Sequence, residues 1–297
     1  MDDDTFEYCS YTPGDSLGHQ PTRDPNRLGN WKCLNNLKSI KSDLFTLITC
    51  SYNTPLITEA MLKTYCMHHE GQHRIIIVEN SDPEDTTREM LATYNIPYTD
   101  GHKILPSGSP PEGNEQWRSH HVGLDWAVRN CKTPYCLIAD TDILFNQNLG
   151  QLFDFFANNE QIALLGPHYE KTKDSPQVLP RVHPCFMMLD VELFKKYDDL
   201  TFNDSHEFGL SHKLMAEKLA DDESYEVGSY LFLRIGEIGK QTSNIKHNSL
   251  YHHCEGASSR LWEVKERSGV SGQLILDFYK DKIFKNLSSI DITNKFY

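Results

Sequence analysis

Apolar runs of strand length alternate with helical segments from Leu44 onward, and this alternation constrains the fold more than any other feature of the chain. The predicted strands are Leu44–Thr49, Arg74–Val78, Tyr135–Ala139, Ile162–Leu165 and Cys185–Leu189. The predicted helices are one from Pro55 to about Tyr65, one capped by Asp82 with Pro83 at its first position, and one over Asn114–Asn130. Strands and helices in this order form a mostly parallel sheet with helices on both faces, which predicts the α/β class.

Polar side chains stand where the first three predicted strands end. Tyr52 follows the first strand, Glu79 follows the second, and Asp140 and Asp142 follow the third. In open α/β sheets, ligands bind beyond the carboxyl ends of the strands. We therefore expect these side chains to line a binding site.

Asp140 and Asp142 are the candidate metal ligands, because they flank Thr141 directly after an apolar run. Carboxylate oxygens suit Mg²⁺ or Mn²⁺, and these ions commonly hold substrate phosphates as well. The alternative is a solvated turn, since aspartate is common where strands end. The position after a buried strand favours the metal site.

The acidic composition argues against a general affinity for nucleic acid. Acidic side chains number 42 and basic ones 29, which gives a formal net charge of −13. The chain begins with Met1-Asp2-Asp3-Asp4 and contains no apolar stretch long enough to cross a membrane, so we expect neither a secretory signal nor a transmembrane segment. Its 8 cysteines include no CxxC pair, which favours a reducing compartment. We expect a soluble, cytoplasmic protein.

Several of these segments, taken in order, resemble the family 2 glycosyltransferases with the GT-A (Rossmann-like) fold. The segments that carry the resemblance are Thr46–Asn53, Ile75–Asn80, His121–Ala127, Ile138–Asp142, Cys185–Asp190, Phe202–Glu207 and Tyr251–Ser258. Together they extend from about Leu44 to Ser259. Their ordered occurrence is more specific than any single motif.

The resemblance implies a metal-dependent, inverting transfer of a sugar from a nucleotide-sugar, with UDP the expected nucleotide, to a hydroxyl of a glycan or related acceptor. It assigns a Mn²⁺ or Mg²⁺ ion to Asp140, Asp142 and His253. It assigns the general base to Glu207 or, failing that, to Asp204. Donor binding is assigned to Cys50, Tyr52, Asn53, Glu79, Arg118, Asp140 and Thr141.

The resemblance also suggests a division of the chain. Residues 1–42 are rich in Asp, Pro, Gly, Asn and Ser, and we expect them to form an N-terminal extension or arm. Residues 43–260 would form the catalytic domain, with a donor-binding half at 43–145 and an acceptor-binding half at 146–260. Residues 261–297 would form a helical tail.

Two other functions are compatible with such a fold. A nucleotidyltransferase acting on sugar phosphates also uses an α/β sheet, a divalent metal and acidic ligands. It usually carries a glycine-rich, basic phosphate loop after its first strand, and Ser51–Pro55 has neither feature. A non-catalytic nucleotide-sugar-binding GT-A domain is the other alternative. The joint presence of Asp140, Asp142, Glu207 and His253 favours an enzyme.

Overall fold

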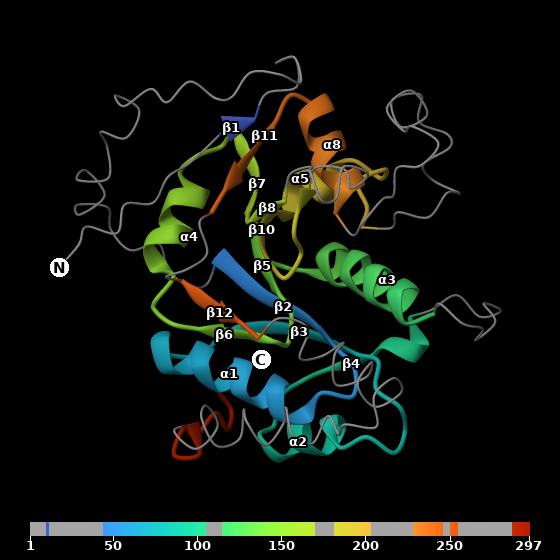
Figure 1. Cartoon of the computed structure of the whole chain (residues 1–297), viewed down its shortest axis with the longest axis vertical. Helices are drawn as coiled ribbons and strands as arrows, with labels where there is room; N and C mark the ends of the chain where they lie inside the picture. The colour runs from blue at the N-terminus through green and yellow to red at the C-terminus, as the bar shows by residue number, and fades with distance from the viewer. Residues whose placement is uncertain are drawn as a thin grey trace. The chain divides into compact units, whose positions relative to one another are not determined.

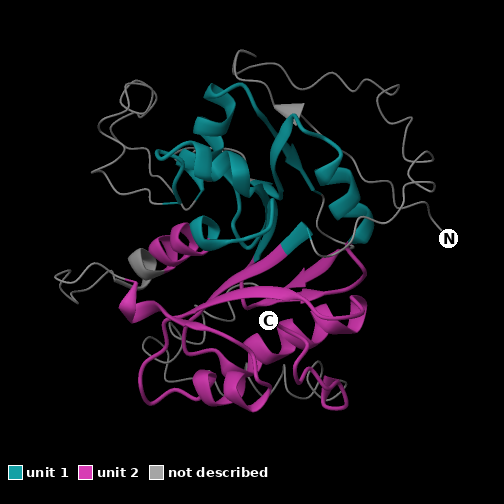
Figure 2. Cartoon of the chain, turned by 180° about the vertical axis from the view of Figure 1, so that it is seen from behind, with its two compact units in different colours: residues 1–45, 128–138, 150–246 teal, residues 46–127, 139–149, 247–297 magenta. Residues whose placement is uncertain are grey.

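The computed structural model describes residues 10–11, 44–104, 115–169, 181–202, 228–245, 250–254 and 287–297 (Figure 1). The chain divides into two compact units, each built from separate stretches of sequence (Figure 2). Unit 1 comprises Met1–Phe45, Val128–Ile138 and Gly150–Lys246; unit 2 comprises Thr46–Ala127, Ala139–Leu149 and His247–Tyr297. Within the described residues, no helix is both long enough and apolar enough to cross a membrane.

Unit 2 is built on three parallel strands in the order β2 (Phe45–Ser51), β3 (Arg74–Glu79) and β4 (Thr99–Asp100). Helix α1 (Pro55–His68) connects β2 to β3, and helix α2 (Thr87–Thr93) lies between β3 and β4. A short 3₁₀ helix (Gly101–Lys103) and then helix α3 (Glu115–Asn130) follow. A separate ribbon pairs β6 (Ile143–Phe145) with β12 (Tyr251–His253) in antiparallel orientation.

Unit 1 has the strand order β1-β11-β7-β10-β5. Strand β7 (Ile162–Gly166) pairs in parallel with β11 (Gln241–Asn244) and antiparallel with β10 (Phe186–Asp190). Strand β1 (Ser10–Tyr11) pairs antiparallel with β11, and β5 (Tyr135–Ala139) adjoins β10. The remaining elements are a ribbon of β8 (His168–Tyr169) and β9 (Arg181–Val182), and helices α4 (Gly150–Ala157), α5 (Val191–Lys196) and α8 (Ser229–Glu237).

The predicted α/β class and all five predicted strands are confirmed, with ends that shift by one or two residues. The helix predicted to start at Pro83 is wrong, because residues 82–85 form a turn and α2 begins at Thr87. Asp85, not Asp82, accepts the Thr87 backbone N–H at 2.7 Å. The hydroxyl of Thr87 also donates to the Asp85 carboxylate, so the polar residues after Pro83 stabilise the turn and delay the helix.

The central strands are buried because their side chains are almost all apolar. In β2 and β3, Ile48, Ile77 and Val78 have no exposed surface. In unit 1, Leu164 and Leu165 of β7 are equally buried. Burial of a side chain of this size stabilises the fold by about 1.5–3 kcal/mol.

A histidine directly after α1 fixes the connection between this helix and the residues beyond β6. His69 is 6% exposed, and its Nδ1 lies 2.9 Å from the Tyr65 carbonyl oxygen. Its Nε2 lies 2.9 Å from the backbone nitrogen of Leu149. Because a carbonyl can only accept and a backbone N–H can only donate, the ring is neutral and carries its proton on Nδ1.

This arrangement predicts an acid-sensitive fold. Burial lowers the pKa of His69 from 6.5 to about 4. Between these values the unfolded chain binds more protons than the folded chain, so the neutral ring contributes fully above about pH 6.5 and its contribution is lost as the pH falls towards 4. At pH 4.5 the loss should be about 2–3 kcal/mol.

Urea unfolding at pH 7 and pH 4.5 would test this expectation. His69→Leu should lose less free energy of unfolding on acidification than the unchanged chain, whereas His68→Gln, the matched control, should lose as much. Equal losses in the His69 and His68 variants would contradict the role of His69.

Candidate functional site

Asp140, Thr141 and Asp142 form the turn that joins β5 to β6. The Ile143 backbone N–H donates to the Asp140 carbonyl at 3.1 Å and closes the turn. The Asp140 side chain is 26% exposed and the Asp142 side chain only 3%. The hydroxyl of Thr141 is buried and lies 3.4 Å from that of Thr54. The turn therefore has one carboxylate near its surface and one in its interior.

Strand β12 brings His253 to Asp142. In the β6–β12 ribbon, His253 stands opposite Ile143, and the Cys254 backbone N–H donates to the Asp142 carbonyl at 2.9 Å. The Nε2 atom of His253 consequently lies 3.4 Å from Oδ1 of Asp142. That oxygen is buried and accepts no hydrogen bond from the described residues. A buried carboxylate oxygen without a donor is costly unless a ligand or cation satisfies it.

A second imidazole, that of His120, lies beside Asp140 and is not among the predicted site residues. Nε2 of His120, on α3, is 3.9 Å from Oδ1 of Asp140. Burial lowers the pKa of His120 to about 4, although the Asp142 charge acts in the opposite direction. The ring is therefore neutral near pH 7 and has a lone pair that could bind a metal. Its place next to His121, in a segment that carries the resemblance, was the signal available in the sequence.

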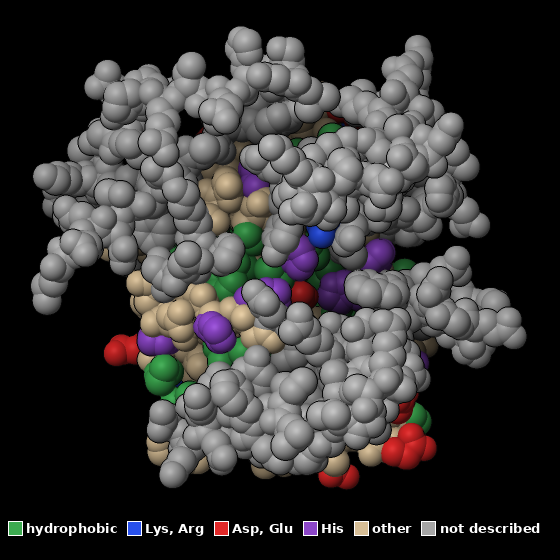
Figure 3. Space-filling model, viewed as in Figure 1, with side chains coloured by type: hydrophobic (Ala, Val, Ile, Leu, Met, Phe, Trp, Pro, Cys, Tyr) green, Lys and Arg blue, Asp and Glu red, His purple; other side chains and the backbone are tan. Residues whose placement is uncertain are grey.

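The two carboxylates disfavour each other's charge. Burial, and then the Asp142 charge, raise the pKa of Asp140 to about 7, while His253 opposes this shift. A divalent cation would remove the repulsion. Figure 3 shows histidine and acidic side chains near one another on one face of the molecule.

The residues of this turn fit a divalent cation, although they do not form a closed cage. In the part of the chain that the structure describes, no three His, Cys, Asp or Glu side chains are gathered closely enough to hold an ion. Mg²⁺ and Mn²⁺ sites of nucleotide-binding enzymes commonly consist of one or two carboxylates completed by substrate phosphates and waters. Asp142 with its unsatisfied oxygen, Asp140 and His253 offer the donor types that Mn²⁺ accepts.

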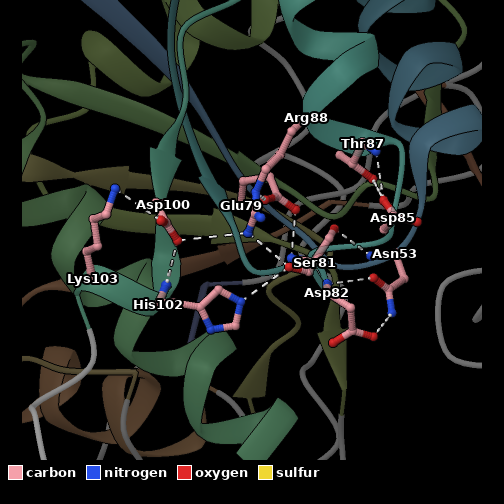
Figure 4. Close-up of polar contacts among 10 residues, drawn as sticks. All are labelled: Asn53, Glu79, Ser81, Asp82, Asp85, Thr87, Arg88, Asp100, His102 and Lys103. Carbon is pink, nitrogen blue, oxygen red and sulfur yellow. Dashed lines mark hydrogen bonds and ion pairs between the residues drawn. The ribbon is translucent and has the colours of Figure 1, made fainter.

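The loop after β3 is held at Ser81 by hydrogen bonds to its backbone and side chain (Figure 4). The Ser81 N–H donates to Glu79 Oε1 at 2.7 Å, and its carbonyl accepts from Arg88 Nη2 at 2.9 Å. Nε2 of His102 lies 3.2 Å from the same carbonyl. The Asn53 backbone N–H donates to the Ser81 hydroxyl at 2.8 Å. The loops after β2 and β3 are thus tied to each other.

Glu79 supports this loop from within. It has no exposed surface, and Arg88 Nε donates to its Oε2 at 2.5 Å. Arg88 also lies 3.9 Å from Asp100, which Lys103 approaches to 3.3 Å (Figure 4). Because each carboxylate oxygen of Glu79 accepts a hydrogen bond inside the protein, Glu79 positions Ser81 and Arg88.

Tyr52 and Asn53 lie on the outer side of the same loops. Asn53 has a positive φ of 50°, a conformation that asparagine tolerates better than most residues. Its side chain donates to Asp82 Oδ2 at 2.7 Å and accepts the Asp82 backbone N–H at 3.0 Å. The Tyr52 hydroxyl is 3.5 Å from the same carboxylate. Tyr52 is half-buried.

Cys50, at the end of β2, contacts α3. Its thiol donates to the His120 carbonyl at 3.8 Å, and burial raises its pKa well above the ordinary range, so the thiol stays protonated. The remaining predicted residues cannot be placed in the site. Glu207 and Asp204 lie outside the described residues, and Arg118 falls in α3 at a position where only the backbone is described.

Comparisons with known proteins give partial structural matches. No family model matches the chain, and no curated protein matches its sequence. Among solved structures, the chain is similar to the mannosyltransferase PcManGT from Pyrobaculum calidifontis in complex with GDP-Man and Mn²⁺, at 14% identity and a TM-score of 0.45, covering 79% of this chain and 66% of that one.

Two further matches belong to the same enzyme class. The galactosyltransferase LgtC, in complex with donor and acceptor sugar analogues, matches at 12% identity and a TM-score of 0.42, over 65% of this chain and 70% of that one. Glucosyl-3-phosphoglycerate synthase from Mycobacterium tuberculosis, in complex with phosphoglyceric acid, matches at 13% identity and a TM-score of 0.36, over 51% of this chain and 58% of that one. All three proteins are glycosyltransferases.

Proposed function

We propose that the chain is a metal-dependent glycosyltransferase that takes a sugar from a nucleotide-sugar and passes it to an acceptor hydroxyl. The observation that carries this proposal is the buried Asp142 Oδ1, which accepts no hydrogen bond from the described residues and lies 3.4 Å from the imidazole of His253. Asp140 stands beside it with its pKa raised to about 7. Such a cluster suits a divalent cation shared with a diphosphate.

Asp142, Asp140 and His253 would hold Mn²⁺ or Mg²⁺ in this proposal. When bound, such a cation neutralises the charge that develops on a leaving nucleoside diphosphate. The chain's own residues supply the rest of the donor site. Tyr52, which is half-buried on the loop after β2, would stack on the nucleotide base, and Asn53 and Ser81 would fix the loops against which the base would lie.

The acceptor chemistry rests on sequence alone. In a single inverting displacement, a carboxylate removes the proton from the acceptor hydroxyl as its oxygen attacks the anomeric carbon. We propose Glu207 for this role, or Asp204 if Glu207 is not the base. The sugar, the acceptor and the choice of UDP as nucleotide belong to the proposal as well.

The alternative of a nucleotidyltransferase is disfavoured by the loop after β2. This loop is fixed by an asparagine–aspartate pair and has no lysine, arginine or glycine between Ser51 and Pro55. A phosphate-binding loop of that class would present backbone N–H groups and a basic side chain. A non-catalytic binding domain would bind the nucleotide and lack turnover, so an activity assay distinguishes it from a glycosyltransferase.

Nucleotide binding provides the first test of the proposal. UDP, GDP and dTDP are each added at a saturating concentration, with Mn²⁺ or with EDTA, and the Tm is measured. We expect one of them to raise the Tm in the presence of Mn²⁺ and much less in EDTA, because a ligand that binds only the native state stabilises it.

Turnover provides the second test. The matching nucleotide-sugars are then assayed for release of the nucleoside diphosphate. Release of a nucleoside diphosphate supports the glycosyltransferase, whereas release of pyrophosphate from a nucleoside triphosphate and a sugar phosphate would identify a nucleotidyltransferase. Binding without release of either would leave the non-catalytic domain.

A further inference from the structure

We propose that His120 is a second imidazole ligand of the metal, so that the site binds transition metals in preference to Mg²⁺. The inference rests on the proposed function, because it adds a ligand to the ion that Asp140, Asp142 and His253 would share. The juxtaposition that carries it is His120 at Asp140 on one side of the turn and His253 at Asp142 on the other.

The position of His120 is set by the close approach of α3 to β2 and β3. A Cβ atom at Gly123 would lie 3.1 Å from both Cys50 Sγ and Val78 Cγ1, so the helix approaches this closely because it has no side chain there. His120 precedes Gly123 by three residues and therefore lies on nearly the same face of the helix. The Cys50 thiol, which donates to the His120 carbonyl, holds this turn of the helix at the end of β2.

The distances fit ligands that share an ion better than they fit direct bonds. Nε2 of His253 is 3.4 Å from Asp142 Oδ1 and Nε2 of His120 is 3.9 Å from Asp140 Oδ1; no hydrogen bond joins either pair. Ligand atoms at about 2.1 Å from one octahedral ion lie roughly 3 Å apart when adjacent and roughly 4 Å apart when opposite. No three of these side chains are gathered around one point in the described residues, so a bound cation would have to draw the two pairs together; four donors would then leave two positions for phosphate oxygens.

The donor set determines the metal preference. Carboxylates and waters suit Mg²⁺, whereas imidazole nitrogens suit transition metals, and affinity rises from Mn²⁺ to Co²⁺ at such sites. One imidazole beside two carboxylates is compatible with either kind of ion. Two imidazoles shift the preference away from Mg²⁺.

The neighbouring residue His121 provides a matched control. It stands on the same helix, its ring centroid is 6.2 Å from that of His120, and it too is half-buried. Its Nε2 has no hydrogen-bond partner among the described residues, yet no ion pair places it at either carboxylate. Replacing it removes an imidazole from the same region without removing the proposed ligand.

The experiment uses the full chain with the nucleoside diphosphate, among UDP, GDP and dTDP, that stabilises it most. Pulsed EPR on bound Mn²⁺ counts the coordinated nitrogens, and titrations give the Kd values of Mn²⁺, Co²⁺ and Mg²⁺. We expect two nitrogens in the unchanged chain, one in His120→Asn, one in His253→Asn and two in His121→Asn. His120→Asn should weaken Mn²⁺ and Co²⁺ at least about tenfold and Mg²⁺ much less.

Each outcome bears on a distinct claim. Suppose that Mn²⁺ in the unchanged chain has one coordinated nitrogen, which persists in His120→Asn and disappears in His253→Asn. This result would overturn the role of His120 and leave the proposed function standing. Failure of the unchanged chain to bind Mn²⁺ with any of the nucleotides would overturn the proposed function itself. Circular dichroism on each variant checks the fold, and Gly123→Ala, which should displace the helix and keep the imidazole, is expected to lower the nitrogen count as well.

Discussion

Asp142→Asn is expected to eliminate the Mn²⁺-dependent part of nucleotide binding and to reduce sugar transfer by at least about 10³-fold, the scale on which a main source of charge stabilisation contributes. The amide keeps the shape of the side chain and removes the negative charge that a cation needs. The fold should tolerate the change, because Asp142 Oδ1 accepts no hydrogen bond from the described residues. Removal of a buried charge whose Oδ1 accepts no hydrogen bond from the described residues should leave the free energy of unfolding unchanged or raise it.

Asp190→Asn is the matched control for this variant. Asp190 also ends a buried strand, but its carboxylate accepts the Leu193 backbone N–H at 2.9 Å and caps α5. Asparagine is about as good a cap, so nucleotide affinity and stability should both stay close to those of the unchanged chain. Isothermal titration with Mn²⁺ or EDTA measures the affinities. An Asp142→Asn protein with intact Mn²⁺-dependent affinity would contradict the metal assignment.

The strands and their polar ends could be predicted because each signal is local. The Tyr135–Ala139 run followed by Asp140-Thr141-Asp142 predicts a buried strand with two carboxylates at its end, and β5 and its turn have that form. The apolar runs at Ile162 and Cys185 likewise predict β7 and β10. Local patterns do not fix strand direction, so the antiparallel pairing of β7 with β10 could not be predicted from them.

The parts of the site that could not be predicted depend on pairing between distant segments. Strand β12 is only three residues long, and nothing in Tyr251–His253 shows that it pairs with β6. The motif resemblance named His253, but only the pairing explains why its ring reaches Asp142. His120 lies on a helix that the sequence predicts. The sequence does not show that this helix approaches β2 and β3 closely at Gly123. The prediction of a helix capped by Asp82 at Pro83 is wrong because Asp85, which the local pattern does not single out, stabilises a turn that delays the helix to Thr87.

Glu79 is a side chain whose partner could not be predicted from the local sequence pattern. Its place after a buried strand predicts a carboxylate at the donor site, and in the structure this carboxylate accepts a bond from the Arg88 guanidinium, nine residues further along the chain. That pairing changes the effect expected from mutation. Mutation of this pair should first lower the free energy of unfolding, and it should affect ligand binding only by displacing the Ser81 loop.

Arg88→Ala is therefore expected to destabilise the protein by about 3 kcal/mol, because it leaves the Glu79 carboxylate buried without its cation. Glu79 has no exposed surface, and of its two oxygens only Oε1 would keep a partner, the Ser81 N–H. The Ser81 carbonyl would lose its bond from Arg88 at the same time. Glu79→Gln should cost less, since Arg88 is 28% exposed and can turn its charge towards water.

Arg234→Ala provides the comparison that isolates burial. Arg234 also donates to a carboxylate, that of Asp199 at 2.7 Å, but the Asp199 side chain is 32% exposed. Water can solvate Asp199 once its partner is removed, so this variant should cost no more than about 1 kcal/mol. Urea unfolding at pH 7 gives the three free energies. Similar costs for Arg88→Ala and Arg234→Ala would show that Glu79 reaches water when Arg88 is absent, and its role as a buried anchor of the Ser81 loop would then have to be abandoned.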